Sequence, residues 1–291
     1  MRAQLDGSPL SPWASAEWSR RQTLLTNLRT VAGRAYPRVI GAIREPSWVF
    51  FEILLPFLTT SAFVFVYRAL KAPPDYIGFV VLGGAMTAFW GNVIWSMASQ
   101  LYWEKDQGNL ELYFTAPMPI MAVILGMAAG GMFATSLRAI VVLGAGALVY
   151  GVVFSVSQWA LLILVFLLTL AALYGLGMML AGLFVLWGRE AFHLTQVLQE
   201  PVYFLSGLNF PVGRLGLVGA LAIGLMPLAV GLDAMRQLAF AGSASFGTPS
   251  PSVEALILVV MVVVSVALAR WLLATLERLA RAEGRLSARW R

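Results

Sequence analysis

The sequence predicts an all-α integral membrane protein with six transmembrane helices, and three observations lead to that class. Hydrophobic residues make up 59% of the chain and charged residues only 12%, against about 25% charged residues in soluble domains. Apolar runs long enough to cross a bilayer as helices recur along the chain. Arginines cluster beside the first and the last of these runs, as they do on the cytosolic face of membrane proteins.

The first 46 residues are expected to form a cytosolic tail and an amphipathic interfacial helix. Residues 1–19 are polar, and they lack the apolar core and small-residue cleavage site of a signal peptide. Across residues 17–43, leucine, valine and alanine recur at helical spacing between basic residues. A basic amphipathic helix of this kind lies in the headgroup plane with its apolar side toward lipid. Pro37 is expected to kink it.

The transmembrane domain, residues 47–275, contains six apolar segments that are each long enough to span the bilayer, since about 20 helical residues suffice. The segments are residues 48–70, 76–99, 120–149, 159–187, 191–210 and 253–273. A further apolar stretch, residues 212–240, is divided by Pro227 into two pieces that are too short to cross. We therefore expect a re-entrant helical hairpin there, and a basic cytosolic tail at residues 276–291 after the last span.

The arginines decide between six and seven crossings. The positive-inside rule places the basic clusters that flank the first and last spans in the cytosol, which requires an even number of crossings. The two clusters are Arg20, Arg21, Arg29, Arg34, Arg38 and Arg44, and Arg270, Arg278, Arg281, Arg285, Arg289 and Arg291. A re-entrant 212–240 segment satisfies this requirement, whereas a spanning one does not.

Residues 103–117 are the most polar segment between two long apolar blocks, and they predict a short amphipathic helix in the cytosol. Leu110, Tyr113 and Phe114 fall on one face of it, and Pro117 ends it because proline has no N–H for a continuing helix. The charged positions are Glu104, Lys105, Asp106 and Glu111. Two interpretations fit the spacing: a docking surface for a partner, or an ordinary loop helix at the membrane interface.

The order of residues in this segment follows a known pattern. Acidic residues are followed by Gly108, then by Leu110-Glu111-Leu112 and Thr115-Ala116-Pro117. This order resembles the E-x-x-x-G-T-L-E-x-L-x-x-[ST]-P segment of ABC-2-type transporter permeases, the type V exporters. The chain departs from the pattern in having Asn109 where the family usually has threonine, and Ala116 between the threonine and the proline.

Two further motifs resemble the same family, in the order expected. Ser206-Gly207-Leu208-Asn209-Phe210-Pro211 is similar to its S-G-x-x-F-P motif at the outer end of the fifth helix. Pro227 followed by Asp233-Ala234-Met235-Arg236 is similar to its P-x-x-x-x-x-[DE]-x-x-R motif. The resemblance assigns an outer gate at the re-entrant region, with the residues Ser206, Gly207, Phe210, Pro211, Pro227, Asp233 and Arg236.

The resemblance also implies partners. The 103–117 segment would be the coupling helix that contacts a separate ABC ATPase subunit, present in two copies, and ATP and Mg²⁺ would be bound there and not on this chain. A second permease subunit, identical or homologous, would complete the pathway in the plasma membrane, among membrane lipids. The implied ATPase-coupling residues are Trp103, Glu104, Asp106, Gly108, Leu110, Glu111, Tyr113 and Phe114.

Intramembrane polar residues are candidates for the transport path, because they are costly in lipid and usually face a cavity or a partner helix. Gln196, Gln199 and Glu200 share one face of the fifth span, and Asn92 lies in the second. These residues either line a path or form structural hydrogen bonds at a helix or subunit contact. Arg138 is expected to extend its charge toward the membrane surface rather than to pair with a carboxylate.

Several functions are excluded by composition. The chain has no cysteine and one histidine, so no thiolate or His-cluster metal site is expected. Its only lysines, Lys71 and Lys105, lie outside any P-loop pattern, so we expect a transport subunit and not an ATPase. The net charge of +6 is attributed to the inner membrane face and not to nucleic acid.

The expected function is export of an amphipathic drug, antibiotic or lipid-like molecule, with ATP hydrolysis on the partner. Short outer loops leave no room for a large external domain, which fits such a substrate. The alternatives are an ABC-2 exporter of a polysaccharide or a cation, and a transporter driven by an ion gradient. Ion-gradient transporters often contain internal repeats and mid-membrane carboxylates, whereas no repeat is evident here and Glu200 is the one prominent mid-membrane acid.

Overall fold

The computed structural model describes residues 20–109, 113, 120–188, 190–240 and 249–283, which are helical apart from short connections. In chain order the described helices are α1 (Arg20–Arg44), α2 (Pro46–Ala69), α3 (Asp75–Gly91), the π-helix η1 (Asn92–Ala98), α4 (Gln100–Asp106), α6 (Ile120–Tyr150), α7 (Trp159–Trp187), α8 (Glu190–Leu205), the 3₁₀ turn η2 (Val212–Leu215), α9 (Leu217–Leu225), α10 (Pro227–Ala239) and α11 (Pro251–Glu283). The predicted all-α class is confirmed for these residues.

Five helices among the described residues are long and apolar enough to cross a membrane, against the six predicted. They are α2, the continuous helix from α3 through α4, α6, α7 and α11. The predicted fifth span is the one that differs, because α8 ends at Leu205 after 16 residues, or about 24 Å. The chain then turns at Gly207, which adopts a φ of 62°.

The 212–240 segment is divided as the sequence predicted. Pro227 begins α10, and the backbone at Met226 is extended, so α9 and α10 are separate helices of 9 and 13 residues. Proline at the first helical position lacks only an N–H that would have no partner there. Helix α10 is almost wholly buried against α7 and α11, whereas Leu221 and Leu225 of α9 are exposed.

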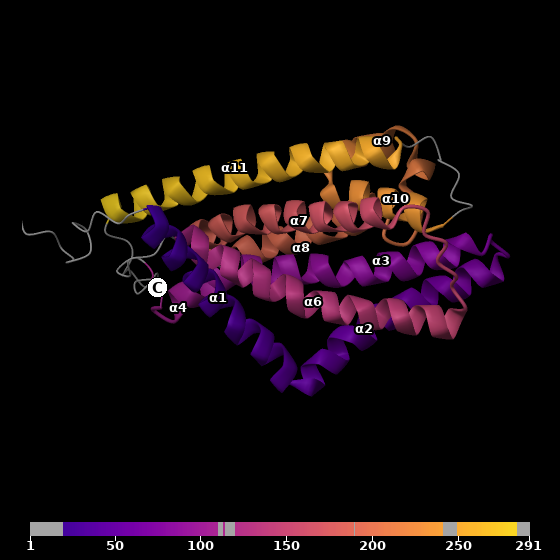
Figure 1. Cartoon of the computed structure of the whole chain (residues 1–291), viewed down its shortest axis with the longest axis horizontal. Coiled ribbons are helices and arrows are strands. Elements are labelled where there is room, and N and C mark those ends of the chain that lie inside the picture. Colours follow the sequence, from indigo (N-terminus) through magenta and orange to yellow (C-terminus); the bar gives the residue numbers. More distant parts are fainter. Residues whose placement is uncertain (1–19, 110–112, 114–119, 189, 241–248, 284–291) are drawn as a thin grey trace, which may run out of the picture.

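The long helices run side by side, with the start of α1, helix α4 and the end of α11 at one end of the bundle, here called the α4 end (Figure 1). Helices α9 and α10 lie at the opposite end, the α10 end. The helix from Asp75 to Asp106 is the central one, because 72% of its most apolar window is buried, compared with 11% for α2. A movement at α4 therefore acts on the middle of the bundle.

Helices α1 and α2 form a V beside the bundle, with its elbow near Glu45 (Figure 1). Helix α1 packs along α6, and glycines allow the two backbones to approach: a Cβ atom on Gly126 would lie 2.7 Å from the Val31 carbonyl oxygen. The apolar side of α1 points outward, with Leu24 and Leu28 exposed, as expected for a lipid-facing side. Its arginines do not all face water, however, because several are turned toward the bundle.

Candidate functional site

Helix α4 carries the first part of the predicted coupling segment, as a continuation of the second span. Trp103 is 46% exposed and Asp106 is also exposed at the α4 end. Glu104 is turned the other way and is 5% exposed. It forms an ion pair with Arg34 of α1 and accepts a hydrogen bond from Gln100 at 3.1 Å. Glu104 therefore connects α4 to α1, while Trp103 and Asp106 face outward.

The turn after α4 depends on Gly108, whose φ of 77° favours glycine. The Asn109 N–H donates back to the Glu104 carbonyl at 2.8 Å, which closes the turn. Leu110, Glu111 and Phe114, predicted to form the contact face, lie outside the described residues. Tyr113 packs under the Arg34 guanidinium, 5.2 Å from the ring centre, and burial raises the pKa of Tyr113 to about 12.

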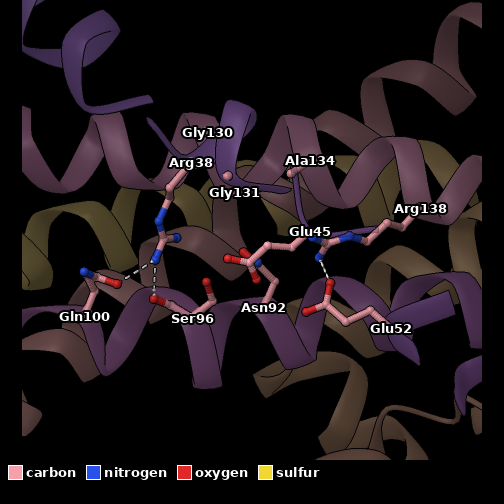
Figure 2. Close-up of a pocket in the computed structure, with 11 residues that line it drawn as sticks. Arg38, Glu45, Glu52, Asn92, Ser96, Gln100, Gly130, Gly131, Ala134 and Arg138 are labelled. Carbon is pink, nitrogen blue, oxygen red and sulfur yellow. Dashed lines mark hydrogen bonds and ion pairs between the residues drawn. The ribbon is translucent and has the colours of Figure 1, made fainter. Parts of the chain in front are cut away.

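A polar pocket of about 430 Å³ lies between α1, α2, η1 and α6 (Figure 2). Four charged side chains and three neutral polar ones line it, together with small residues of α1 and α6. The charged and polar residues are Arg38, Glu45, Glu52, Asn92, Ser96, Gln100 and Arg138. The predicted path residue Asn92 thus lies in this pocket, where it accepts a hydrogen bond from the Tyr174 hydroxyl at 2.9 Å.

Arg138 is paired, which corrects the prediction that it would extend toward the membrane surface. It is 8% exposed, and its guanidinium forms an ion pair with Glu52 of α2 (Figure 2). Glu52 precedes Arg138 by 86 residues in the chain, and the packing of α2 on α6 brings the two side chains together. Loss of the carboxylate would leave a largely buried charge without its counter-ion, which is destabilising.

Arg38 reaches from α1 to the end of the central helix. It donates to the Ser96 carbonyl and, at 3.1 Å, to the Gln100 side chain (Figure 2). Burial lowers the pKa of Arg38 from its usual value, although arginine remains charged in proteins. Ser96 belongs to η1. π-helical turns are rare in proteins, and those that occur are often found at functional sites. No signal for η1 was present in the sequence, because a hydropathy pattern assumes the α-helical period.

The α8 residues predicted for the path do not line the polar pocket. Gln199 accepts a hydrogen bond from the Trp95 indole at 3.0 Å, so it contacts the central helix. Gln196 and Glu200 are exposed, on a helix that also exposes Val197 and Phe204. The structure therefore separates Asn92 from the outward-facing polar side chains of α8.

Of the residues predicted for the outer gate, Phe210 contacts the buried side chain of Arg236 at the α10 end. This side chain is 2% exposed, and its guanidinium donates to the backbone carbonyls of Phe79 and Leu208 at 3.0 Å and of Phe210 at 3.2 Å. Helix α10 is thereby joined to α3 and to the turn that follows α8. Ser206 in the same turn is fully buried and donates to the Met226 sulfur at 3.9 Å.

Asp233 lies in a second buried cluster, which includes an acid that the sequence analysis missed. The Gln237 amide donates to Asp233 at 2.9 Å and to Glu254 of α11 at 3.3 Å, and both carboxyl groups are buried. Glu254 is the single acid in the first turn of the last span, which could have marked it. Within the described ranges, no group of three His, Asp or Glu residues could hold a metal ion.

Comparison with known protein families gave a match whose residues include both the polar pocket and the α10 end. A search of curated proteins gave no match. The family described as ABC-2 type transporter matches residues 38–240, a range that contains the central helix, the polar pocket and the Arg236 cluster, and that is more than half of the 291 residues. This chain therefore belongs to the ABC-2 type transporter family.

Proposed function

We propose that this chain is the permease subunit of an ATP-driven exporter, with ATP and Mg²⁺ bound by two copies of a separate ABC ATPase. A second permease subunit completes the pathway, and an amphipathic drug, antibiotic or lipid-like molecule moves outward through it. Membership of the ABC-2 type transporter family supports transport as the general activity. The mechanism of coupling rests on the structure of the α4 end.

The observation that carries the proposal is that the residues of α4 face in two directions, some toward solvent and one toward α1. Trp103 and Asp106 are exposed, so they are available to a partner, whereas Glu104 is buried against Arg34. In the proposed mechanism the ATPase contacts the exposed residues. Its closure moves α4, and the movement is transmitted inward along η1 and sideways through Glu104 to α1. Both routes lead to the polar pocket, because Arg38 connects α1 to Ser96 and Gln100.

The orientation follows from the basic residues. The start of α1 and the end of α11 lie at the α4 end (Figure 1), and the arginine clusters at these termini belong in the cytosol. The α4 end then faces the ATPase, and the α10 end faces outward. Five helices other than α8 are long enough to cross the membrane. Six crossings therefore require that α8 and the turn after it together cross the bilayer once.

The exposed side of α8 is the proposed transport path. It combines the polar side chains of Gln196 and Glu200 with apolar Val197 and Phe204. An amphipathic molecule complements such a surface. Its polar part pairs with the polar side chains, which are costly to leave in lipid, and its apolar part contacts the apolar ones. The second permease would cover this side and enclose the path.

Co-purification of the ATPase tests the proposal. Trp103→Ala is expected to weaken binding of the ATPase by about 2 kcal/mol or more, because buried aromatic anchors carry much of an interface's energy. Phe114→Ala should act in the same direction if residues 110–117 continue the contact surface. The measurement is the amount of ATPase retained on a tagged permease in detergent.

Trp159→Ala is the matched control, since Trp159 is 67% exposed at the start of α7, at the opposite end of the bundle (Figure 1). Unchanged retention in Trp103→Ala and Phe114→Ala would refute the assignment of the coupling surface. Equal loss in Trp159→Ala would show that the effect is not specific to the α4 end.

A further inference from the structure

An apolar groove of about 490 Å³ adjoins the polar pocket at the elbow of α1 and α2. Ala134 and Arg138 of α6 line both hollows. The main apolar residues of the groove are Ile43, Val49, Phe50, Phe133, Leu137 and Val141. Both volumes are in the range of about 300–1,000 Å³ that is usual for ligand sites. The two hollows together form one amphipathic site.

The polar half of this site contains charges of both signs. Arg38 and Arg138 come from α1 and α6, two helices that pack against each other beside the pocket, and the exposed Glu45 carboxylate lies between the two side chains (Figure 2). Arg138 is neutralised by Glu52. The described hydrogen bonds of Arg38 go to uncharged oxygens of Ser96, Gln100 and Met127. A ligand with an anionic group beside a cationic group would complement Arg38 and Glu45.

The apolar half lies at the periphery of the helix bundle, where an acyl chain can enter from the surrounding membrane. Ile43 of α1 is 61% exposed and Phe50 of α2 is 58% exposed, and Phe133 of α6 is exposed as well. Phe50 and Phe133 belong to helices that are long and apolar enough to cross a membrane, and Ile43 belongs to α1, which is expected at the membrane interface. The occupant that combines an apolar chain with a zwitterionic group at this position is a membrane lipid.

We propose that the elbow binds one phospholipid with an amine-bearing headgroup, such as phosphatidylethanolamine. The phosphate lies toward Arg38, the ammonium group toward Glu45, and an acyl chain occupies the groove between α1, α2 and α6. The bound lipid connects the α1–α2 elbow to α6. This site is separate from the exposed side of α8 that we propose for transport, and binding here requires no ATPase.

Photo-crosslinking of the full-length permease, purified without the ATPase, tests the site. The probe is phosphatidylethanolamine with a diazirine on one acyl chain, and the labelled peptides are identified by mass spectrometry. Labelling should concentrate on the peptides of α1, α2 and α6 that line the groove. Ala134→Leu should reduce this labelling at least about tenfold, because its side chain fills the junction of the two hollows.

Ala129→Leu is the matched control on the same helix, since Ala129 is exposed and lines neither hollow. It should retain full labelling. Labelling spread evenly over the lipid-facing helices, and equal in both variants, would overturn the proposal and indicate annular lipid only. The result does not depend on the coupling surface, so the two proposals can fail separately.

The headgroup assignment has its own variant, which involves an exposed residue and so avoids a folding defect. Glu45→Gln should lower labelling by phosphatidylethanolamine about fivefold, which corresponds to losing one charge-assisted hydrogen bond. Labelling by the phosphatidylglycerol analogue, which has no amine, should not fall. An equal decrease for both probes, or no decrease for either, would overturn the assignment of the amine to Glu45.

Discussion

Arginine side chains turn toward neighbouring helices at both ends of the bundle, fully buried at the α10 end and partly buried toward the α4 end, and the two ends hold the charge by different means. At the α10 end, Arg236 donates to three backbone carbonyls, those of Phe79, Leu208 and Phe210. Toward the α4 end, Arg34 pairs with the side chain of Glu104, and Arg38 donates to the side chain of Gln100 as well as to carbonyls. Arg38 also borders an open pocket, whereas Arg236 is 2% exposed.

The difference indicates which end is able to move. Backbone carbonyls are fixed by the helix or turn to which they belong, so Arg236 is released only if α3 or the turn after α8 deforms. Side-chain partners can change rotamer and exchange with water or a ligand at lower cost. We infer that the α10 end is a rigid joint and that the α1, α4 and η1 region rearranges during transport. Three predictions test this comparison.

The largest effect is expected at the rigid joint. Arg236→Met should destabilise the protein by about 3–5 kcal/mol, since removal of a buried charged donor leaves three carbonyls without their hydrogen bonds. Arg236→Lys should recover only part of this loss, because an ammonium group lacks the planar fork of donors. The measurement is thermal unfolding of the permease in detergent.

Arg68→Met is the control for this substitution. Arg68 is exposed and donates to a single carbonyl, that of Tyr150, at 3.2 Å, so a change below about 1 kcal/mol is expected. Equal unfolding temperatures for Arg236→Met and the wild type would contradict the description of a rigid joint.

A smaller effect on stability, but a larger one on coupling, is expected at Glu104. Glu104→Gln should cost about 1–3 kcal/mol of stability and lower the amount of substrate transported per ATP, because α4 loses its ionic link to α1. The exchange of the pair, Arg34→Glu with Glu104→Arg, should restore part of both. Transport and ATP hydrolysis are measured in the same reconstituted complex.

Asp106→Asn provides the comparison on the same helix. Asp106 is exposed, so its substitution should weaken the proposed contact with the ATPase but leave both the unfolding free energy and the ion pair between α4 and α1 unchanged. If Glu104→Gln transports as many molecules per ATP as the wild type, then α4 and α1 do not move together.

The smallest effect on stability is expected on α8. Glu200 is exposed, so Glu200→Gln should change the unfolding free energy by no more than about 0.5 kcal/mol. Substrate-stimulated ATP hydrolysis should nevertheless change, and most for a cationic substrate, which an acid in a low-dielectric path attracts. Loss of the assembled complex, with no measurable hydrolysis, would favour a structural role at a subunit contact.

The features that were predicted most accurately from the sequence are those that depend on local composition. The bounds of α7 match the expected 159–187 segment, and those of α6 differ from 120–149 by one residue, because an apolar run needs no tertiary information to form a membrane helix. The break at Pro227 was predictable for the same reason. The end of α8 was not, because the predicted span continued to Phe210 through Ser206 and Gly207, whereas the structure turns at Gly207 and directs the carbonyls of Leu208 and Phe210 to Arg236.

The candidate sites were harder to predict from the sequence, because they depend on contacts between residues that are far apart in the chain. Arg34 and Glu104 are 70 residues apart, and the hydrogen-bond partners of Arg236 are carbonyls, which every residue possesses. The family resemblance identified Arg236 and Glu104 as positions of interest. It did not indicate that Glu104 faces α1 while Trp103 faces outward, a distinction that required the structure.

The π-helical segment η1 has a consequence for the register of the whole central helix. Each residue of an α-helix advances the chain by about 100° around the axis. A π-turn holds about one residue more than an α-turn, so the segment Asn92–Ala98 accommodates a residue that an ordinary α-helix would place in the next turn. If the same residues wound as an ordinary α-helix, everything that follows would rotate by about that angle, turning Glu104 away from Arg34 and carrying Trp103 off its present face. The winding of this segment, and not only its composition, therefore sets the direction in which α4 points.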